Sequence, residues 1–511
     1  NYITSGGTTT NNINTVTLSF VDMAVNTGAT VNVGNTDITS TGTITVDNGV
    51  FTIDGAGGSY NFADVTVNAN GSWIATAAYD PTFTNATITN NGIFTGCSNT
   101  TGCSYALEGT GGFAGSAAMT SMSDFVLGDG ATYTNTNSGG LAITDRLATV
   151  GTATFINGAN GVMSYGGTSG NFSVTNFTAS ASPNTVIYNR TTSNQAIRET
   201  TDGAYHNLTI DKAIGFNVST TTEVTVNGML TMTLGDLIMG GQNLIMADGA
   251  TIAGGNADSY IQDNGNGVLR QLYAAAGATL NFPIGDDDDF SPINSFTISS
   301  ATFGASPFLD FSITDADHPN RDTDNTGAGG DDDGTATTAF ISRYWTVSPN
   351  DISSPRYNAS YTYVDGDVTG TETNLMGTIY RTPPGEAFAD WHVGGTVNNS
   401  TNRVSISNID AFGDLYAMDN ILNRLPIVLV SFDIKATEST VEIAWVTASE
   451  ENNDLFTIER SVDGREFLPI ITVAGADNSQ DLITYNTVDR SPLNGRSYYR
   501  LKQTDFNGQF E

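Results

Sequence analysis

The sequence predicts an all-β protein that begins with a parallel β-solenoid, also called a β-helix. One short phrase, an alternating Val/Ile/Thr strand closed by an Asn-Gly or Asp-Gly-like turn, returns four times between residues 25 and 92. Its glycines, Gly28, Gly49, Gly71 and Gly92, are 21, 22 and 21 residues apart. Such a period is typical of solenoids, in which each coil buries its inner face only against its neighbours. The composition agrees, because 56 of 511 residues are glycine, only 14% are charged and no run shows a helical pattern.

Each repeated turn pairs a glycine with an Asn or Asp. Glycine adopts the positive φ of a corner without a Cβ clash. The neighbouring amides recur at equivalent corners, so we expect them to stack from rung to rung and to satisfy backbone groups that no strand covers. The next equivalent turn is expected at residues 128–130. Gly130 lies 38 residues beyond Gly92, which is longer than the period of 21. The residues in between are interpreted as a loop inserted between rungs.

The chain divides into three predicted domains, which fits its length at about 150 residues per domain. The solenoid covers residues 1–265, because the repeat ends in polar turn residues between 256 and 267. Residues 266–424 are predicted to form a β-sandwich, since aromatic-rich strands there are separated by loops of unequal length. Residues 425–511 form the third domain.

The third domain contains four characteristic segments: Leu425–Phe432, Val441–Asp454, Phe456–Gly464 and Ser497–Gln503. In these segments it resembles the fibronectin type III-like module of exported Bacteroidetes proteins, which usually precedes the sorting domain of type IX secretion cargo. Shorter phrases upstream are similar to large surface proteins of the same bacteria: Tyr205–Ile210, Phe282–Gly285 and Arg343–Val347. The resemblance implies an extracellular protein or one on the outer cell surface. The sequence departs from the family at Glu511, where the family continues into a closing strand and a sorting domain.

The charge balance is strongly acidic. There are 53 acidic and 18 basic residues, a net charge of −35, and no Lys or Arg precedes Arg146. Phosphate backbones and anionic membrane surfaces attract Lys and Arg, so neither nucleic acid nor a membrane surface is an expected partner. No apolar run approaches the 18 residues or so that membrane insertion needs. The charge favours solubility and suits a carrier of divalent cations.

Cys97 and Cys103 are the only two cysteines. The five residues between them are rich in turn formers and allow a small disulfide loop to close. A metal site would need further ligands, and no histidine lies within a hundred residues. We therefore expect a disulfide and an oxidising compartment outside the cytoplasm.

The segment 322–333 has the ligand spacing of a calcium loop. Asp322, Asp324 and Thr326 occupy positions 1, 3 and 5, a glycine occupies position 6 and Asp333 occupies position 12. Position 12 is Asp in place of the bidentate Glu and no helices flank the loop, so this is not an EF-hand. Calcium and a plain disordered acidic loop both remain open. The acidic run 286–289 is interpreted as a solvated hairpin tip.

An enzyme is the competing class, since parallel β-helices often host polysaccharide lyases and hydrolases. A lyase needs a Lys or Arg base, and a hydrolase needs two carboxylates that converge on one cleft. The basic residues and the histidine of the predicted solenoid are Arg146, Arg190, Arg198, Lys212 and His206. Its early acids stand singly near probable turns and are expected to be solvated corners: Asp22, Asp37, Asp47, Asp54 and Asp64. We expect a structural His206, no catalytic residues and no enzyme.

The tryptophans are weighed between the core and a sugar-binding platform. Trp345, Trp391 and Trp445 lie in strand-like contexts and are expected in the core. Trp73 follows a corner, and the sequence does not fix which way it faces.

Together these features predict a secreted or cell-surface structural or adhesive protein with a β-solenoid stalk. It is expected to form a homo-oligomer or an extracellular filament. Six strands can be counted in the third domain where the family has seven, which leaves an open sheet edge. Such an edge, or an exposed end rung of the solenoid, can pair with a strand from another copy. The alternative is a polysaccharide-binding or polysaccharide-degrading β-helix protein, with a polysaccharide or cell-surface ligand.

Overall fold

The structure is a computed structural model of the chain. It describes all residues except 1, 5–9, 14–17, 36, 56–57, 77–79, 97–103, 322–336, 383, 386–389, 420–428, 449, 480–481 and 506–511. The chain forms two compact units, Asn1–Asp419 and Asn420–Glu511. Strands make up 59% of the residues, and the described part of the chain has no α-helix and three short 3₁₀ helices: η1 (Ser169–Asn171), η2 (Asp365–Asp367) and η3 (Glu372–Asn374).

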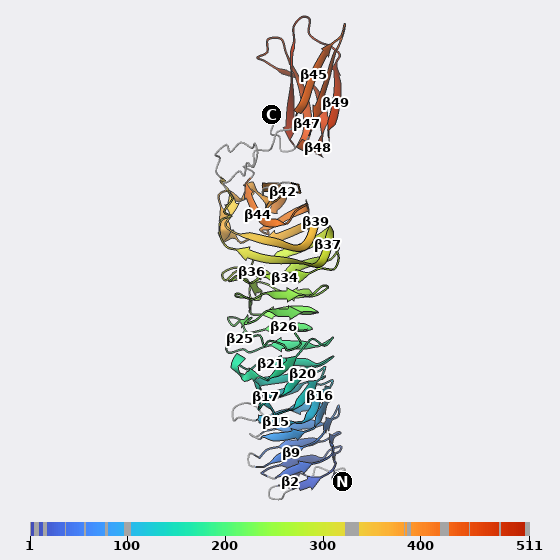
Figure 1. Cartoon of the computed structure of the whole chain (residues 1–511), viewed down its shortest axis with the longest axis vertical. Helices are drawn as coiled ribbons and strands as arrows, with labels where there is room; N and C mark the ends of the chain where they lie inside the picture. The colour runs from blue at the N-terminus through green and yellow to red at the C-terminus, as the bar shows by residue number, and fades with distance from the viewer. Residues whose placement is uncertain are drawn as a thin grey trace. The chain divides into compact units, whose positions relative to one another are not determined.

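The first unit is built on a parallel solenoid of about 12 turns, which confirms the predicted fold class. In Figure 1 its rungs lie one above another. One face is a nine-stranded sheet in which each strand pairs with its counterpart one rung away, without a register shift. Its strands are β1 (Tyr2–Thr4), β4 (Met23–Val25), β7 (Ile44–Val46), β10 (Val65–Val67), β13 (Thr87–Asn90), β16 (Thr110–Gly115), β18 (Thr132–Asn135), β20 (Thr154–Asn157) and β23 (Asn176–Thr178).

Two further columns of parallel strands complete the early rungs. The first holds β2 (Thr10–Ile13), β5 (Thr30–Val33), β8 (Val50–Ile53), β11 (Ser72–Ala75), β14 (Ile93–Thr95), β17 (Met119–Leu127), β19 (Leu141–Thr149), β21 (Val162–Tyr165), β24 (Thr185–Tyr188), β26 (Asn207–Asp211), β29 (Met229–Leu234) and β32 (Thr251–Gly254). The second holds β3 (Leu18–Phe20), β6 (Ile38–Ser40), β9 (Tyr60–Phe62), β12 (Pro81–Thr84), β15 (Ser104–Glu108) and β22 (Phe172–Ser173). The long strands β17 and β19 belong to both columns.

The later rungs continue the same pattern with shorter strands. One face holds β25 (Gln195–Ala196), β27 (Val218–Ser219), β30 (Leu237–Ile238), β33 (Ile261–Gln262) and β36 (Ile284–Gly285). Another holds β28 (Val224–Val226), β31 (Leu244–Met246) and β34 (Leu269–Leu272). Isolated parallel bridges from Ala179 to Tyr205 and from Tyr205 to Val226 link β23 to β28.

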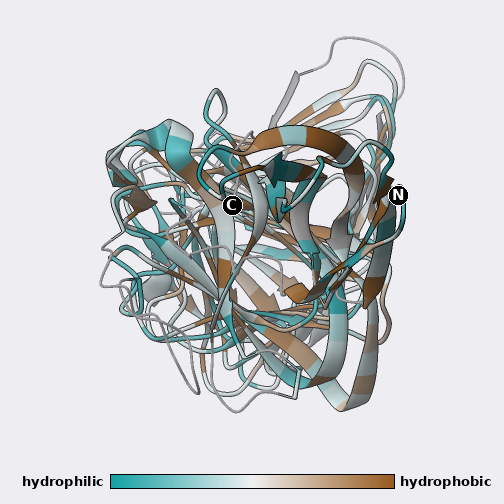
Figure 2. Ribbon diagram, turned by 90° about the horizontal axis from the view of Figure 1, so that it is seen from above, coloured by the Kyte–Doolittle hydropathy of each residue, from teal (hydrophilic) through white to brown (hydrophobic). Residues whose placement is uncertain are grey.

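The inside of the solenoid is filled by side chains that alternate along each strand. Figure 2 shows hydrophobic and hydrophilic residues alternating along the strands, as a half-buried strand requires. Trp73 is fully buried between Phe51 and Phe94, with ring centroids 4.4 and 5.6 Å away. A second row of buried rings runs through Phe62, Phe83 and Tyr105 and continues to Phe125. Stacked rings of successive rungs therefore form a dry, close-packed core.

The interpretation of residues 93–127 as an inserted loop is wrong. The segment contributes a complete rung, in which Gly112 of β16 pairs with Thr87 and Phe113 packs inside. The turn at 128–130 leads from β17 into β18, whereas the turns at Gly28 and Gly92 leave the nine-stranded sheet. It therefore occupies a different corner.

Parallel pairing also continues past the predicted boundary at residue 265, as far as β34 and β36. There β34 pairs antiparallel with the long strand β37 (Ile293–Thr314), so the solenoid and the following sheet are continuous. The other antiparallel strands are β35 (Thr279–Phe282), β38 (Phe340–Ile341), β39 (Tyr344–Thr362), β40 (Val368–Thr369), β41 (Leu375–Arg381), β42 (Asp390–Asn398), β43 (Arg403–Ile409) and β44 (Gly413–Asp419). Because β39 pairs with both β43 and β44, five strands close a ring in the order β39, β43, β42, β41, β44.

The second unit contains two antiparallel sheets of three strands each. They are β45 (Leu429–Ala436), β46 (Val441–Thr447) and β49 (Ile483–Asp489), and β48 (Leu468–Ser479), β47 (Glu450–Ser461) and β50 (Tyr498–Asp505). These correspond to the six strands counted in the sequence. Trp445 is the centre of the core between them, stacked on Tyr485 at 5.1 Å and edge-on to Phe456 at 5.3 Å. Trp345, Trp391 and Trp445 are all buried, as expected. The only helices in the described residues are the three short 3₁₀ helices, and none of them is long and apolar enough to cross a bilayer.

Candidate functional site

The residues predicted to bind calcium, Asp322, Asp324, Thr326 and Asp333, lie outside the described residues, and so do Cys97 and Cys103. The calcium loop and the disulfide therefore stay predictions. Within the described part of the chain, no group of three or more His, Cys, Asp or Glu side chains is arranged to hold a metal ion.

The scattered acids of the solenoid have a shared structural task, which the sequence did not reveal. The carboxylates of Asp22, Asp37 and Asp64 accept hydrogen bonds from the backbone N–H groups of Thr43, Ser59 and Thr87, one rung further on, at 2.8, 2.8 and 2.7 Å. The same bond recurs from Ser104 to Asp80, Thr110 to Asn85, Thr152 to Asp129, Met229 to Asn207, Val268 to Asn243 and Ala274 to Asp248. We call this set the corner staples.

The corner staples meet a backbone need. At a corner the strand ladder is interrupted, so N–H groups there require other acceptors. A short Asp or Asn side chain supplies one from the preceding rung, and its spacing of about one turn matches the repeat. The expectation that corner amides stack is confirmed further in, where buried Asn135 donates to Asn157 at 2.8 Å. The carboxylates of the corner staples therefore bond one rung of the solenoid to the next.

The basic residues of the solenoid are tied to the same framework. Arg146 forms an ion pair with Asp124 at 3.3 Å. Lys212 is buried, and its Nζ donates to Ser193 O and to Gln195 Oε1, both at 2.9 Å. Burial, and secondarily the nearby Arg190, lower the pKa of Lys212 to about 8.

His206 and Trp73 complete the predicted candidates of the solenoid. His206 Nε2 lies 3.2 Å from Ser182 Oγ at a corner beside Gly228. Trp73 points inward and offers no platform for a sugar.

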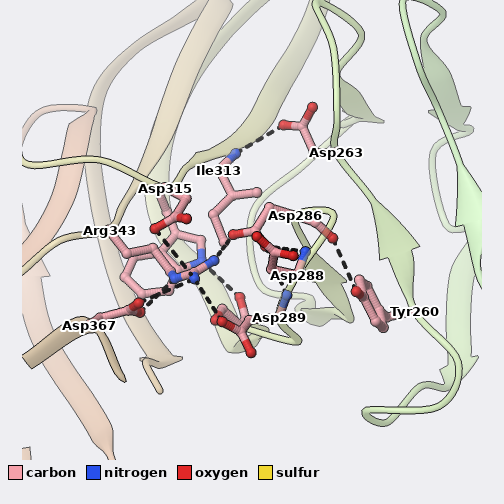
Figure 3. A network of polar contacts seen from close by, with 11 residues as sticks. Tyr260, Asp263, Asp286, Asp288, Asp289, Ile313, Asp315, Arg343 and Asp367 are labelled. Carbon is pink, nitrogen blue, oxygen red and sulfur yellow. Dashed lines mark hydrogen bonds and ion pairs between the residues drawn. The ribbon is translucent and has the colours of Figure 1, made fainter. Parts of the chain in front are cut away.

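A cluster of charged side chains lies where the solenoid joins the antiparallel sheet. Figure 3 shows the side chain of Arg343 among the carboxylates of Asp286, Asp289, Asp315 and Asp367. Its Nε lies 2.6 Å from Asp367, its Nη2 lies 3.4 Å from Asp289 and 3.6 Å from Asp315, and its Nη1 forms an ion pair with Asp286. Arg343 has no exposed surface. We call these five residues the junction cluster.

The junction cluster joins four separate segments of the chain. Asp286 and Asp289 follow the last parallel strand β36, Asp315 follows β37, Arg343 precedes β39, and Asp367 ends η2. The carboxylate of Asp286 also accepts the N–H groups of residues 288 and 289 at 2.9 and 2.8 Å, so the acidic run is a folded turn. The interpretation of residues 286–289 as a solvated tip is therefore wrong for Asp286, which is buried.

The cluster carries more negative than positive charge. Four carboxylates surround one guanidinium, so they repel one another. Burial first, and then the neighbouring Asp367, raise the pKa values of Asp289 and Asp315 above the usual range. Charge-assisted contacts with four carboxylates fix the buried guanidinium in place. Arg343 therefore holds the last rung of the solenoid against the antiparallel strands that follow it.

His318 anchors the segment that leads to residue 322. Its Nε2 lies 3.1 Å from Asp414 Oδ2, and its Nδ1 accepts the N–H of Asn320 at 3.2 Å. The imidazole is enclosed by the rings of Tyr344, Tyr380, Trp391 and Tyr416. With these contacts the imidazole is packed as a core side chain.

A buried carboxylate also organises the second unit. Glu450 accepts hydrogen bonds from Thr447 Oγ1 at 2.7 Å, from Asn453 Nδ2 at 2.7 Å and from the N–H of Ala476 at 2.9 Å. Burial alone would raise the pKa of Glu450, but these bonds and one from Tyr485 lower it below its usual value.

Comparison of the chain with models of known protein families, with curated proteins and with solved structures finds no match in any of the three. The function is therefore argued from the geometry.

Proposed function

We propose that the chain is a secreted or cell-surface structural protein whose solenoid serves as a rigid spacer or adhesive scaffold. The observation that carries this proposal is the set of corner staples. Side chains that could perform chemistry are instead used, rung after rung, to bond one turn of the solenoid to the next.

The packed interior supports the same role. Buried aromatic rings from successive rungs stack on one another, so side chains fill the interior of these described rungs. Continuous rung-to-rung pairing over about 12 turns makes the stability of each rung depend on its neighbours.

The extracellular location rests on the sequence. The net charge of −35 favours solubility, and the second unit resembles modules of exported proteins. Immunogold labelling of intact, unpermeabilised cells tests this proposal. We expect label on the cell surface or the protein in the medium, and label found only after permeabilisation would refute the location.

A filament subunit is the more specific form of the proposal. Electron microscopy of native material tests it, because filaments with a repeat along the solenoid axis would support assembly. If single particles are seen at every concentration, the filament proposal is refuted and the spacer proposal is unaffected.

A further inference from the structure

One face of the solenoid carries outward side chains without charge. It belongs to the first column of parallel strands and runs from Thr30 and Asn32 on β5 to Thr251 and Ala253 on β32. Each strand contributes one or two outward side chains, with only the first halves of the long strands β17 and β19 included. The described outward residues are all Thr, Ser, Asn, Ala, Val, Ile or Met. We call this set the neutral face.

The rungs keep the neutral face in line. Ile187 on β24 pairs with Ser164 on the preceding rung and with Thr209 on the following one, without a register shift. The outward residues of β5, β8 and β11 pair in the same way, and a register shift between β17 and β19 separates the two runs. Within each run an outward side chain therefore recurs at the strand spacing of about 4.8 Å.

The neutral face is more apolar than the outer side of the nine-stranded sheet. On that sheet most described outward residues are Thr, as in Thr45 and Thr66, and Ile156 is the large aliphatic exception. The neutral face has large aliphatic side chains on six strands: Val50, Ile74, Ile93, Val162, Ile187 and Met229. Ile93 is 57% exposed and Met229 is 41% exposed. Aliphatic side chains that recur on one face of a water-facing sheet are typical of a contact surface.

The charge of the chain argues for a second copy as the partner. Carboxylates border the neutral face, since Asp54 follows β8 and Asp211 ends β26. With a net charge of −35, most other surfaces of two copies repel each other, and a face without charge lets them approach without bringing carboxylates together. A basic partner would be attracted to the acidic border and would find no counter-charge on the face itself.

The neutral face is large enough for a stable dimer. About 12 turns, spaced by about 4.8 Å, extend over roughly 55 Å, and a strand of four residues is about 13 Å long. The face therefore covers roughly 700 Å² on each copy, or about 1,400 Å² in total. Specific protein interfaces bury about 1,200 to 2,000 Å² in total.

We propose that the neutral face packs against the neutral face of a second copy, as two sheets pack face to face in a sandwich. The aliphatic side chains of each copy cover those of the other, and the hydroxyl groups between them exchange hydrogen bonds. Because both copies use the same surface, the contact is two-fold symmetric and closes at two copies. It differs from contacts through an end rung or a sheet edge, and it holds whether or not the chain forms filaments.

Sedimentation-velocity ultracentrifugation of the full chain tests the proposal. We expect a monomer at nanomolar concentration and a dimer, with no larger species, at tens of micromolar. The dimer should become tighter in about 1 M sodium chloride, where the Debye length is about 3 Å, because salt screens the repulsion between the bordering carboxylates. A monomer under all these conditions, an open series of larger species, or a dimer that salt dissociates would overturn the proposal.

Two matched substitutions locate the contact. Ile187→Glu and Ile156→Glu add the same charge at outward, partly exposed isoleucines on different faces of the solenoid. Ile187→Glu should weaken dimerisation at least tenfold, because it buries an unpaired carboxylate from each copy, whereas Ile156→Glu should leave it unchanged. Thr209→Glu, on the strand beside Ile187, repeats the test if Ile187→Glu fails to fold. Equal dimerisation of the variants on the two faces would contradict the assignment.

Discussion

The corner staple of Asp64 provides a measurable test of how the solenoid is held together. Its carboxylate accepts the backbone N–H of Thr87 at 2.7 Å, one rung away. A hydrogen bond to a charged group contributes about 1.5 to 3 kcal/mol, and the exposed position of Asp64 places it near the lower limit. Asp64→Ala should therefore open this corner by about 1.4 kcal/mol, which corresponds to about tenfold faster exchange of the Thr87 amide hydrogen.

Hydrogen exchange resolved to single residues measures this effect. Asp64→Asn keeps an oxygen acceptor and is expected to exchange at nearly the original rate. Asp54→Ala is the matched control, because Asp54 also follows a solenoid strand, and its backbone N–H donates to Val33 O while its carboxylate accepts no hydrogen bond from the described residues. If the exchange of the Thr87 amide hydrogen is accelerated equally in Asp54→Ala and Asp64→Ala, or in neither variant, the proposed role of the Asp64 hydrogen bond is refuted.

Three further predictions concern charge. Arg343→Met removes the cation of the junction cluster and should cost about 3 to 5 kcal/mol at pH 7, measured by denaturant unfolding of the full chain. The loss should shrink as the pH falls and Asp289 and Asp315, whose pKa values are raised, become protonated, and a pH-independent loss would argue against charge as its cause. The two units should respond oppositely to pH in calorimetry. In the first unit, the raised pKa of Asp289 contributes stability that is fully present below the ordinary pKa of about 3.9 and is lost as the pH rises through the pKa of the folded state. In the second unit, the lowered pKa of Glu450 contributes stability that is present above the ordinary pKa of about 4.3 and is lost as the pH falls through the pKa of the folded state. If both melting transitions shift in the same direction with pH, this prediction is contradicted. Calorimetric titration with calcium should show binding that disappears in the Asp322→Ala, Asp324→Ala double variant, and no heat with the unaltered chain would leave the loop without calcium.

The solenoid could be predicted because the glycines recur at a nearly constant spacing in the sequence. The rung within residues 93–127 could not, because its corner near residues 115–118 lacks an Asn-Gly pair. There the side chain of Asn90, on the preceding rung, donates to the carbonyls of Ala117 and Ala118 at 3.2 and 2.9 Å. A corner satisfied from the neighbouring rung has no need of its own amide, so the local sequence carries no signal.

The solenoid extends past the predicted boundary at residue 265 for a related reason. Residues 256–267 are polar, yet Ser259 is fully buried and donates to the carbonyl of Gly235 at 3.0 Å. Polar residues at a corner serve the backbone inside the fold as well as the solvent outside it, so polarity alone did not mark a boundary.

The junction cluster left a weak signal that could have been used. Ile341, Arg343 and Trp345 alternate along one segment, and all three are fully buried. A period of two places an arginine among core positions, and a buried arginine requires carboxylates. Which carboxylates these are could not be read from the sequence, because Asp286, Asp315 and Asp367 come from distant segments that only the fold brings together.

The most direct test of the structural account is the removal of one complete rung. Deletion of residues 45–65 joins Ile44 to Thr66, and register is kept because Thr66 pairs with Thr45 and β8 lies between β5 and β11. In a stack of interchangeable rungs this variant should keep its β-sheet circular dichroism and a cooperative melting transition, because each rung contacts only its neighbours. Deletion of residues 45–54 alone breaks the register and should abolish that transition. If both deletions unfold the chain alike, or both leave it unchanged, the account of the solenoid as a stapled stack of rungs is contradicted.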